Sequence, residues 1–182
     1  MRGRGHRAPR RAAVPPRQLS WLSIRVELVE GRGMRYWPRP GRLFAASKIH
    51  SFSQLATAID DAFARWDRSH IHEFQLSDGT RLGIPDPDFE EVIDDSSARL
   101  ARLQPGEEFT YVFDFGDDWT HICTVGTSAI DPVQSLGIVA EIPTPYFGWG
   151  VMPDQYGRRW SDDDGVSEPP PDPAPRNDLQ NG

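Results

Sequence analysis

The chain has 182 residues, of which 37% are hydrophobic and 26% charged, and its net charge at pH 7 is −7. This length suits one domain with tails, and no apolar run approaches the roughly 18 residues that identify a membrane-spanning helix. Cys123 is the only cysteine, which excludes an internal disulfide and a cysteine-rich zinc site. We therefore expect a cytoplasmic protein with no membrane partner.

Charge and composition divide the chain into three parts. Residues 1–18 carry six arginines and no acid, whereas residues 161–182 carry six acids, one arginine and a proline-rich run. Neither end has enough apolar residues for a core, so we predict a disordered basic arm and a disordered acidic tail. All tryptophan, phenylalanine and tyrosine residues lie within residues 19–160, which we predict to be the single domain.

The basic arm, residues 1–18, allows two interpretations. Its arginines could hold nucleic acid weakly through phosphate charge, in a salt-sensitive way. The alternative is a solvated extension, because the arm contains no base-reading element and the remaining chain is acidic. Any contact with nucleic acid is thus expected from this arm alone.

The first predicted elements are two strands. Apolar and polar residues alternate over residues 22–28, which predicts a strand with one buried face. Residues 42–46 form a second extended stretch, expected to pair with the first after a turn at residues 38–41. Together they predict an antiparallel pair.

One helix is predicted, over residues 52–66. Its apolar residues recur at spacings of three and four, and Ser51 with Gln54 forms a capping-box signature at its start. We expect Leu55, Ile59 and Phe63 to be buried against the sheet.

Two hairpins follow the helix. Residues 71–76 and 81–84 are predicted to pair around a two-residue Asp78-Gly79 turn. Residues 109–115 and 119–125 are predicted to pair around a turn at residues 116–118. Several strands beside a single helix, without regular βαβ alternation, predict an α+β fold: a mostly antiparallel sheet with one main helix packed on it.

The register of the second hairpin decides which side chains share a face. A three-residue loop, which we favour, places Phe115 opposite Trp119 and Phe113 opposite His121. A two-residue loop shifts the pairing by one residue and places Asp114 opposite Trp119. Only the second register puts Asp114 on the face of His121.

Histidines and aspartates cluster in the two hairpins and suggest a metal site. His70 and His72 are two residues apart on a predicted strand, so their imidazoles share one face. His121 with Asp117 or Asp118 could complete the set of ligands around a divalent metal ion, because imidazole and carboxylate are common zinc ligands. The alternative is that these histidines are structural, since His70 and His72 share their face with apolar residues. A bound metal is therefore a hypothesis, and no other cofactor is expected.

A second candidate site lies near the end of the domain, where residues 146–160 are rich in aromatic residues and glycine but have no periodicity. We predict an ordered loop laid on the sheet. Trp149, Tyr156, Arg158 and Arg159 could form the rim of a ligand site, because tryptophan and arginine stack on ligands or clamp them. Simple packing is the alternative.

The strings WDRSHIHEF at residues 66–74 and DPD at residues 86–88, with the YVFDFGDDWTH segment at residues 111–121, resemble the plasmid pRiA4b ORF-3-like family. The resemblance covers about residues 22–127. It implies an α+β domain and a bacterial, plasmid or mobile-element context, without an established reaction. In the commoner pattern of that family a Cys-Pro-Pro-Glu-Asp segment follows, and residues 146–160 take its place here.

Two functions remain open from the sequence. The leading hypothesis is a non-enzymatic binding or accessory module, because no complete catalytic constellation is visible. The rival is a metal-dependent, hydrolase-like enzyme that uses His70, His72, Asp117, Asp118 and His121. The rival requires at least three of these side chains to meet in an open cleft.

Overall fold

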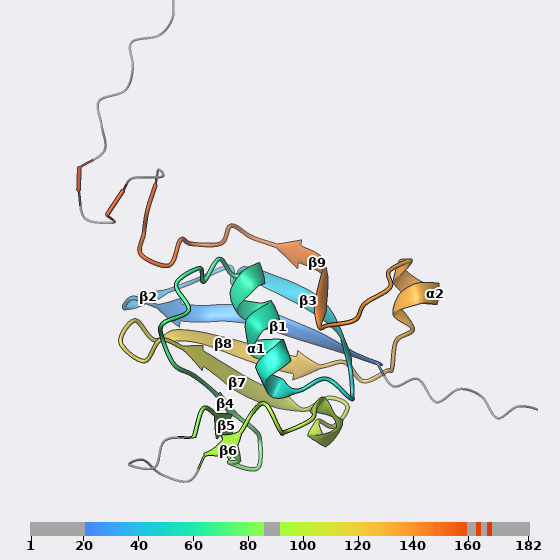
Figure 1. Cartoon of the computed structure of the whole chain (residues 1–182). Coiled ribbons are helices and arrows are strands. Elements are labelled where there is room, and N and C mark those ends of the chain that lie inside the picture. Colours follow the sequence, from blue (N-terminus) through green and yellow to red (C-terminus); the bar gives the residue numbers. More distant parts are fainter. Residues whose placement is uncertain (1–20, 86–91, 160–162, 165–166, 169–182) are drawn as a thin grey trace, which may run out of the picture.

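The computed structural model describes residues 21–85, 92–159, 163–164 and 167–168. The predicted basic arm lies outside the described residues, and so does most of the predicted acidic tail. The described part contains a nine-stranded sheet with one main helix, α1 (Phe52–Ala62), lying across one face (Figure 1). The predicted α+β class is confirmed.

The sheet is antiparallel except at one edge. Its strand order is β6-β5-β4-β7-β8-β1-β3-β9, with β2 paired to β1, and only β5 and β6 run parallel. The strands are β1 (Trp21–Gly31), β2 (Met34–Arg35), β3 (Gly41–Ser47), β4 (His72–Gln75), β5 (Arg81–Gly83), β6 (Ile93–Asp94), β7 (Glu108–Phe113), β8 (Trp119–Val125) and β9 (Thr144–Trp149). Besides α1, the described residues contain a 3-10 turn (Leu100–Arg102) and a short helix, α2 (Pro132–Leu136).

The two predicted strands at the start of the domain are confirmed. In β1 every second residue is buried against the core, as the alternation predicts: Leu22, Ile24, Val26 and Leu28. β3 pairs with β1 in antiparallel register, with Ile24 opposite Phe44. β1 also pairs with β8, so it lies inside the sheet.

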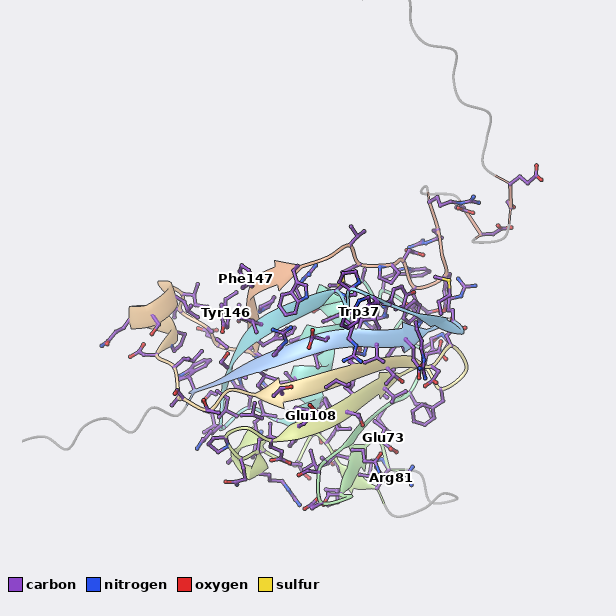
Figure 2. The ribbon with its side chains drawn as sticks, turned by 180° about the vertical axis from the view of Figure 1, so that it is seen from behind. Trp37, Glu73, Arg81, Glu108, Tyr146 and Phe147 are labelled. Carbon is purple, nitrogen blue, oxygen red and sulfur yellow. The ribbon has the colours of Figure 1, made fainter. Side chains whose placement is uncertain are left out.

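Helix α1 covers the core face of the sheet. Its capping box is present, since Ser51 Oγ accepts the Gln54 amide and Gln54 Oε1 accepts the Ser51 amide. Leu55, Ile59 and Phe63 are fully buried, as predicted. Seen from behind, no helix of the described residues covers the other face of the sheet (Figure 2).

The helix ends earlier than predicted. Its last residue is Ala62, and Ala64 has a left-handed φ of 59°, which breaks the helix before Trp66. Trp66 is 46% exposed. Trp66 continues the apolar spacing of the helix, but it packs against Tyr156 and Asp154 instead of the sheet. The spacing of apolar residues does not distinguish these two kinds of packing.

The second hairpin exists, but both expected registers are wrong. Phe113 pairs with Trp119 and Tyr111 pairs with His121, so a five-residue loop joins β7 to β8. Asp114 and Asp118 adopt positive φ, and the Asp118 amide donates to the Asp114 carbonyl at 2.7 Å. The observed pairing differs from the favoured register by two residues, since Tyr111 and not Phe113 lies opposite His121. A shift of two residues leaves each strand residue on the face of the sheet that was predicted for it. It leaves Phe115, expected on the buried face, 51% exposed.

The first hairpin has a longer turn than predicted. The Leu76 amide donates to the Thr80 carbonyl at 2.9 Å, so three residues, 77–79, form the turn. Gly79 has a φ of 84°, a conformation that glycine adopts without strain.

The late aromatic segment also differs from its predicted loop. Its first part is the edge strand β9, which pairs with β3. β9 was missed because Pro145, Gly148 and a bulge near residue 146 interrupt the alternation.

In the described part of the chain, no helix has both the length and the apolar character needed to cross a bilayer.

Candidate functional site

The candidate site is built around Asp60, a buried carboxyl on α1. Asp60 is only 3% exposed because it lies on the sheet-facing side of the helix, one turn before Phe63. The Tyr111 hydroxyl donates to Asp60 Oδ1 at 2.7 Å, and Arg68 Nη1 donates to Oδ2 at 3.2 Å. Burial raises the pKa of Asp60 to about 6, although the Tyr111 bond and the Arg68 charge act in the opposite direction. Asp60 can therefore exchange its proton near neutral pH.

His72 lies on β4 and is held by a second buried carboxylate. Its Nε2 is 2.7 Å from Oδ2 of Asp95, which is 3% exposed. Asp95 reaches this position because its amide donates to the Gly83 carbonyl at the end of β5. Within the described residues, Nδ1 of His72 has no hydrogen-bond partner. The imidazole is thus fixed at one nitrogen and open at the other.

His70 is held at both ring nitrogens. Nδ1 is 3.2 Å from Oδ2 of Asp114, the first residue of the β7–β8 loop, and Nε2 is 2.9 Å from the Tyr156 hydroxyl. The Tyr156 hydroxyl donates to Asp67 Oδ2 at 2.7 Å, which lowers the pKa of Asp67 to about 2 and raises that of Tyr156 to about 12. His70 therefore joins three parts of the chain.

Tyr156 is positioned by a segment that we call the strap, residues 153–156. The Asp67 amide donates to Gln155 Oε1 at 2.9 Å, and Gln155 Nε2 donates to the Asp67 carbonyl at 3.2 Å. The Trp66 indole donates to Asp154 Oδ2 at 3.2 Å. Gln155 is fully buried, so the strap is fastened to the chain that follows α1.

These side chains surround an open cleft of about 380 Å³ between α1 and the β4–β5 hairpin. Five of its seven lining residues are polar, although the exposed wall presents more apolar than polar surface. The lining residues are Thr57, Asp60, Arg68, His70, His72, Ile84 and Phe113. Because a buried acid and two imidazoles meet in one cleft, we take it as the candidate functional site.

The five residues of the predicted metal site are not brought together. His70 and His72 line the cleft, whereas His121 is fully buried and donates through Nδ1 to the Tyr111 carbonyl, at 3.3 Å. Asp117 lies 3.8 Å from Arg32, and Asp118 accepts from the Thr120 hydroxyl. Among the described residues, no three histidine, cysteine or acidic side chains form a group that could hold a metal ion.

Of the four predicted rim residues, Tyr156 and Arg158 lie together around Asp154 and Trp66, whereas Trp149 and Arg159 have other partners. The Trp149 ring lies 4.5 Å beneath the Arg25 guanidinium, and its Nε1 donates to the Arg39 carbonyl. Tyr156 belongs to the cleft through His70. Arg158 bonds to Asp154, and Arg159 bonds to Asp163. Of the four, Tyr156 is the one that contacts a residue lining the cleft.

Sequence reasoning missed the acids that organise the cleft. Asp60 lies four residues after Ala56 and three before Phe63, so it falls on the apolar stripe of α1. An acid on such a stripe is a signal of a buried carboxyl with a partner. Asp95 carries no comparable signal, because it follows a two-residue edge strand.

This geometry defines the class: an α+β domain whose single main helix and β4–β5 hairpin enclose a polar cleft. The fold resembles a crystal structure of a protein of unknown function, MM3350 from Methanosarcina mazei Go1. The two chains are 20% identical with a TM-score of 0.53, over 70% of this chain and 68% of that one. At this identity the likeness concerns the fold alone.

The chain belongs to the plasmid pRiA4b ORF-3-like family, whose profile matches residues 25–138. The match confirms the family resemblance, and it includes His70, His72, Asp60 and Asp95. The strap lies beyond its end. No curated protein matches the chain.

Proposed function

We propose that this domain is a non-enzymatic binding module, an accessory domain of plasmid or mobile-element type, and that the cleft over Asp60, His70 and His72 holds its ligand. The observation that supports this is the arrangement of the polar groups in the cleft. Internal hydrogen bonds fix Asp60 and His70 completely and His72 at one nitrogen. Groups fixed in this way are preorganised, and preorganised groups bind a ligand with little loss of side-chain entropy.

The cleft lacks an activated nucleophile among its lining residues. The Thr57 hydroxyl donates to the Ser53 carbonyl, one turn earlier in α1. Cys123 is fully buried in the sheet, and burial raises the pKa of its thiol, which keeps it unreactive. Binding therefore accounts for the described cleft better than covalent catalysis.

The chemistry of the cleft favours a small polar ligand rich in hydrogen-bond donors. Asp60 is the carboxyl group in the lining of the cleft, and its cationic neighbour Arg68 is shared with Asp61. A donor on the ligand can bind the ionised form of Asp60 and the open nitrogen of His72. The side chains of Ile84 and Phe113 provide an apolar contact for the body of the ligand.

A fragment screen by NMR on the full chain tests this function. Small amines, amides and polyols are the probes, and hits are expected to shift the side-chain signals of His70 and His72. His72→Asn should weaken such hits about tenfold. Gln75→Ala, an exposed change on the same strand, is the matched control and should leave them unchanged. Hits that map elsewhere, or that bind the His72 variant equally, would contradict the proposal.

An acid–base enzyme is the second candidate, and two specific observations favour it. Asp60 has a pKa of about 6, near the value that suits proton transfer, and His72 is oriented by a carboxylate with its other nitrogen open. This candidate predicts turnover of a bound ligand, with a pH profile that Asp60→Asn abolishes. The metal-dependent form of the idea further requires metal in the purified chain, which elemental analysis measures with His72→Ala as the control.

A further inference from the structure

A buried arginine without a carboxylate partner lies beside the strap. The Arg65 side chain is fully buried, its Nη1 donates to the Pro153 carbonyl at 3.1 Å, and its guanidinium stacks 3.5 Å from the Trp119 ring centroid. Nε and Nη2 have no hydrogen-bond partner within the described chain, and neither has Trp119 Nε1. No salt bridge to Arg65 occurs among the described residues. A buried cation left in this state is costly unless an anion approaches it.

The cationic side chain lies against the wall of a cavity of about 460 Å³. Trp119 and Pro153, which contact the Arg65 guanidinium, both line this Trp119 cavity. Tyr36 lines it as well, and Tyr36, Asp60 and Asp154 are among the groups whose charge would favour the cationic form of Arg65. Burial lowers the pKa of Arg65 to about 10, so the guanidinium remains charged at neutral pH.

Two further arginines line the same cavity. The side chains of Arg32 and Arg158 are about one-third exposed, so both reach solvent. Arg32 has one acidic neighbour, Asp117, at 3.8 Å, which is too long for a hydrogen bond.

The carboxylate of Asp154 is the acidic group in the lining of the Trp119 cavity. It accepts from Arg158 Nε and Nη2, from the Trp66 indole, and from the amides of Tyr156 and Arg158. Its charge and its lone pairs are thus committed to Arg158 and the strap. The cavity keeps an excess of positive charge from Arg32 and Arg65.

The geometry points to an oxyanion site: we infer that the Trp119 cavity binds the phosphate or carboxylate group of a small organic molecule. Arg32 donates to the oxygens at the rim through its guanidinium fork, and Arg158 adds its Nη1 group, since its Nε and Nη2 are bonded to Asp154. Arg65, which forms no salt bridge among the described residues, contributes its charge from beneath the wall, where water screens it little. Met34, Tyr36 and Trp119 provide apolar surface for the body of the ligand. This site does not depend on the proposed function of the cleft.

Calorimetric titration of the full chain with phenyl phosphate, inorganic phosphate and benzoate tests the site. At least one of the three should bind, with an affinity that falls as salt rises. Benzoate or phenyl phosphate alone would identify a carboxylate or a phosphate monoester as the ligand class, and equal binding of inorganic phosphate would identify the free anion. Failure of all three at about 10 mM would overturn the inference.

Three sets of variants test the roles of Arg65 and of the two rim arginines, and the Arg65 pair separates the effect of its charge from that of its packing. Arg65→Met keeps an unbranched side chain on Trp119 without charge and should weaken binding about tenfold, whereas Arg65→Lys should stay within about threefold. The double variant Arg32→Gln, Arg158→Gln removes only partly exposed groups and should also weaken binding about tenfold. Arg25→Gln, which loses an arginine stacked on Trp149 at the outer face, is the matched control and should bind as the unmodified chain.

The rim variants keep the test decisive if Arg65→Met does not fold. Unchanged binding in the Arg32, Arg158 double variant would overturn the inference, and its loss would support it. The Nε–H signal of Arg65 in the NMR spectrum gives an independent readout, since binding should shift it while that of Arg25 stays in place.

Discussion

Two polar regions lie five residues apart at the end of α1, and their hydrogen bonding is opposite. Around Asp60, each carboxyl oxygen has a donor, and the neighbouring imidazoles are held by acids. Around Arg65, two guanidinium nitrogens, the Trp119 indole and His121 Nε2 have no partner within the described residues. The first region is complete without a ligand and defines a cleft. The second region leaves buried donors without partners, which is costly unless another polar group approaches them.

The largest expected effect is the loss of Asp60. Asp60→Ala should lower the free energy of unfolding by about 3 kcal/mol, because the fully buried Tyr111 hydroxyl loses its acceptor and a small cavity remains. Asp61→Ala is the matched control, since Asp61 also pairs with Arg68 but is exposed, and it should cost less than about 0.5 kcal/mol. Urea unfolding at pH 7 measures both. An equal loss of unfolding free energy in the two variants would contradict the prediction that the buried Asp60 contributes more to stability than the exposed Asp61.

The carboxyl group of Asp60 should also make the stability of the domain depend on pH. Burial raises the pKa of Asp60 from 3.8 to about 6 in the folded state. The native state therefore holds this proton more tightly, so the contribution is fully present below about pH 4 and is lost as pH rises through 6. The difference between the unmodified chain and Asp60→Asn should fall by about 2 to 3 kcal/mol between pH 4 and pH 7. A flat difference curve would show that Asp60 is solvated.

His121 should have a smaller effect at neutral pH and the opposite sign in acid. Burial, with the nearby Arg65 charge, lowers the pKa of His121 to about 3, so its contribution is present above pH 6.5 and is lost as pH falls. His121→Phe keeps the ring volume and removes the unpartnered Nε2, so stability at pH 7 should change by less than about 1 kcal/mol. Urea midpoints at pH 7 and pH 4.5 measure both effects. A loss of several kcal/mol at pH 7 would show that Nε2 makes an essential bond.

The sequence predicted the regular parts of the fold because their signals are local. The alternation in β1, the stripe and capping box of α1 and the strand pairs all depend on residues close in the chain. Loop register did not follow from composition. Asp114 and Asp118 take left-handed backbone conformations that extend the β7–β8 loop to five residues, and non-glycine residues give little warning of this.

The candidate site was predicted only in part for a related reason. His70 and His72 were identified as a pair on one strand, and both line the cleft. Their partners Asp95 and Asp114 come from other strands and loops, so no spacing rule joins them. His121 was assigned to the same site from sequence, but it is buried in the core beside Tyr111 and against Phe63.

The strap makes the cleft one of the last features the chain can complete during synthesis. Residues 21–125 already supply α1 and eight of the nine strands, together with Asp60, His72 and Asp95. The hydrogen bonds of His70 and Asp67 to Tyr156 and Gln155 cannot form until the ribosome has added these partners, 86 to 89 residues later. A nascent chain can therefore acquire its sheet well before its cleft. The order of translation separates the stage at which the domain becomes stable from the stage at which its polar cleft takes its final form.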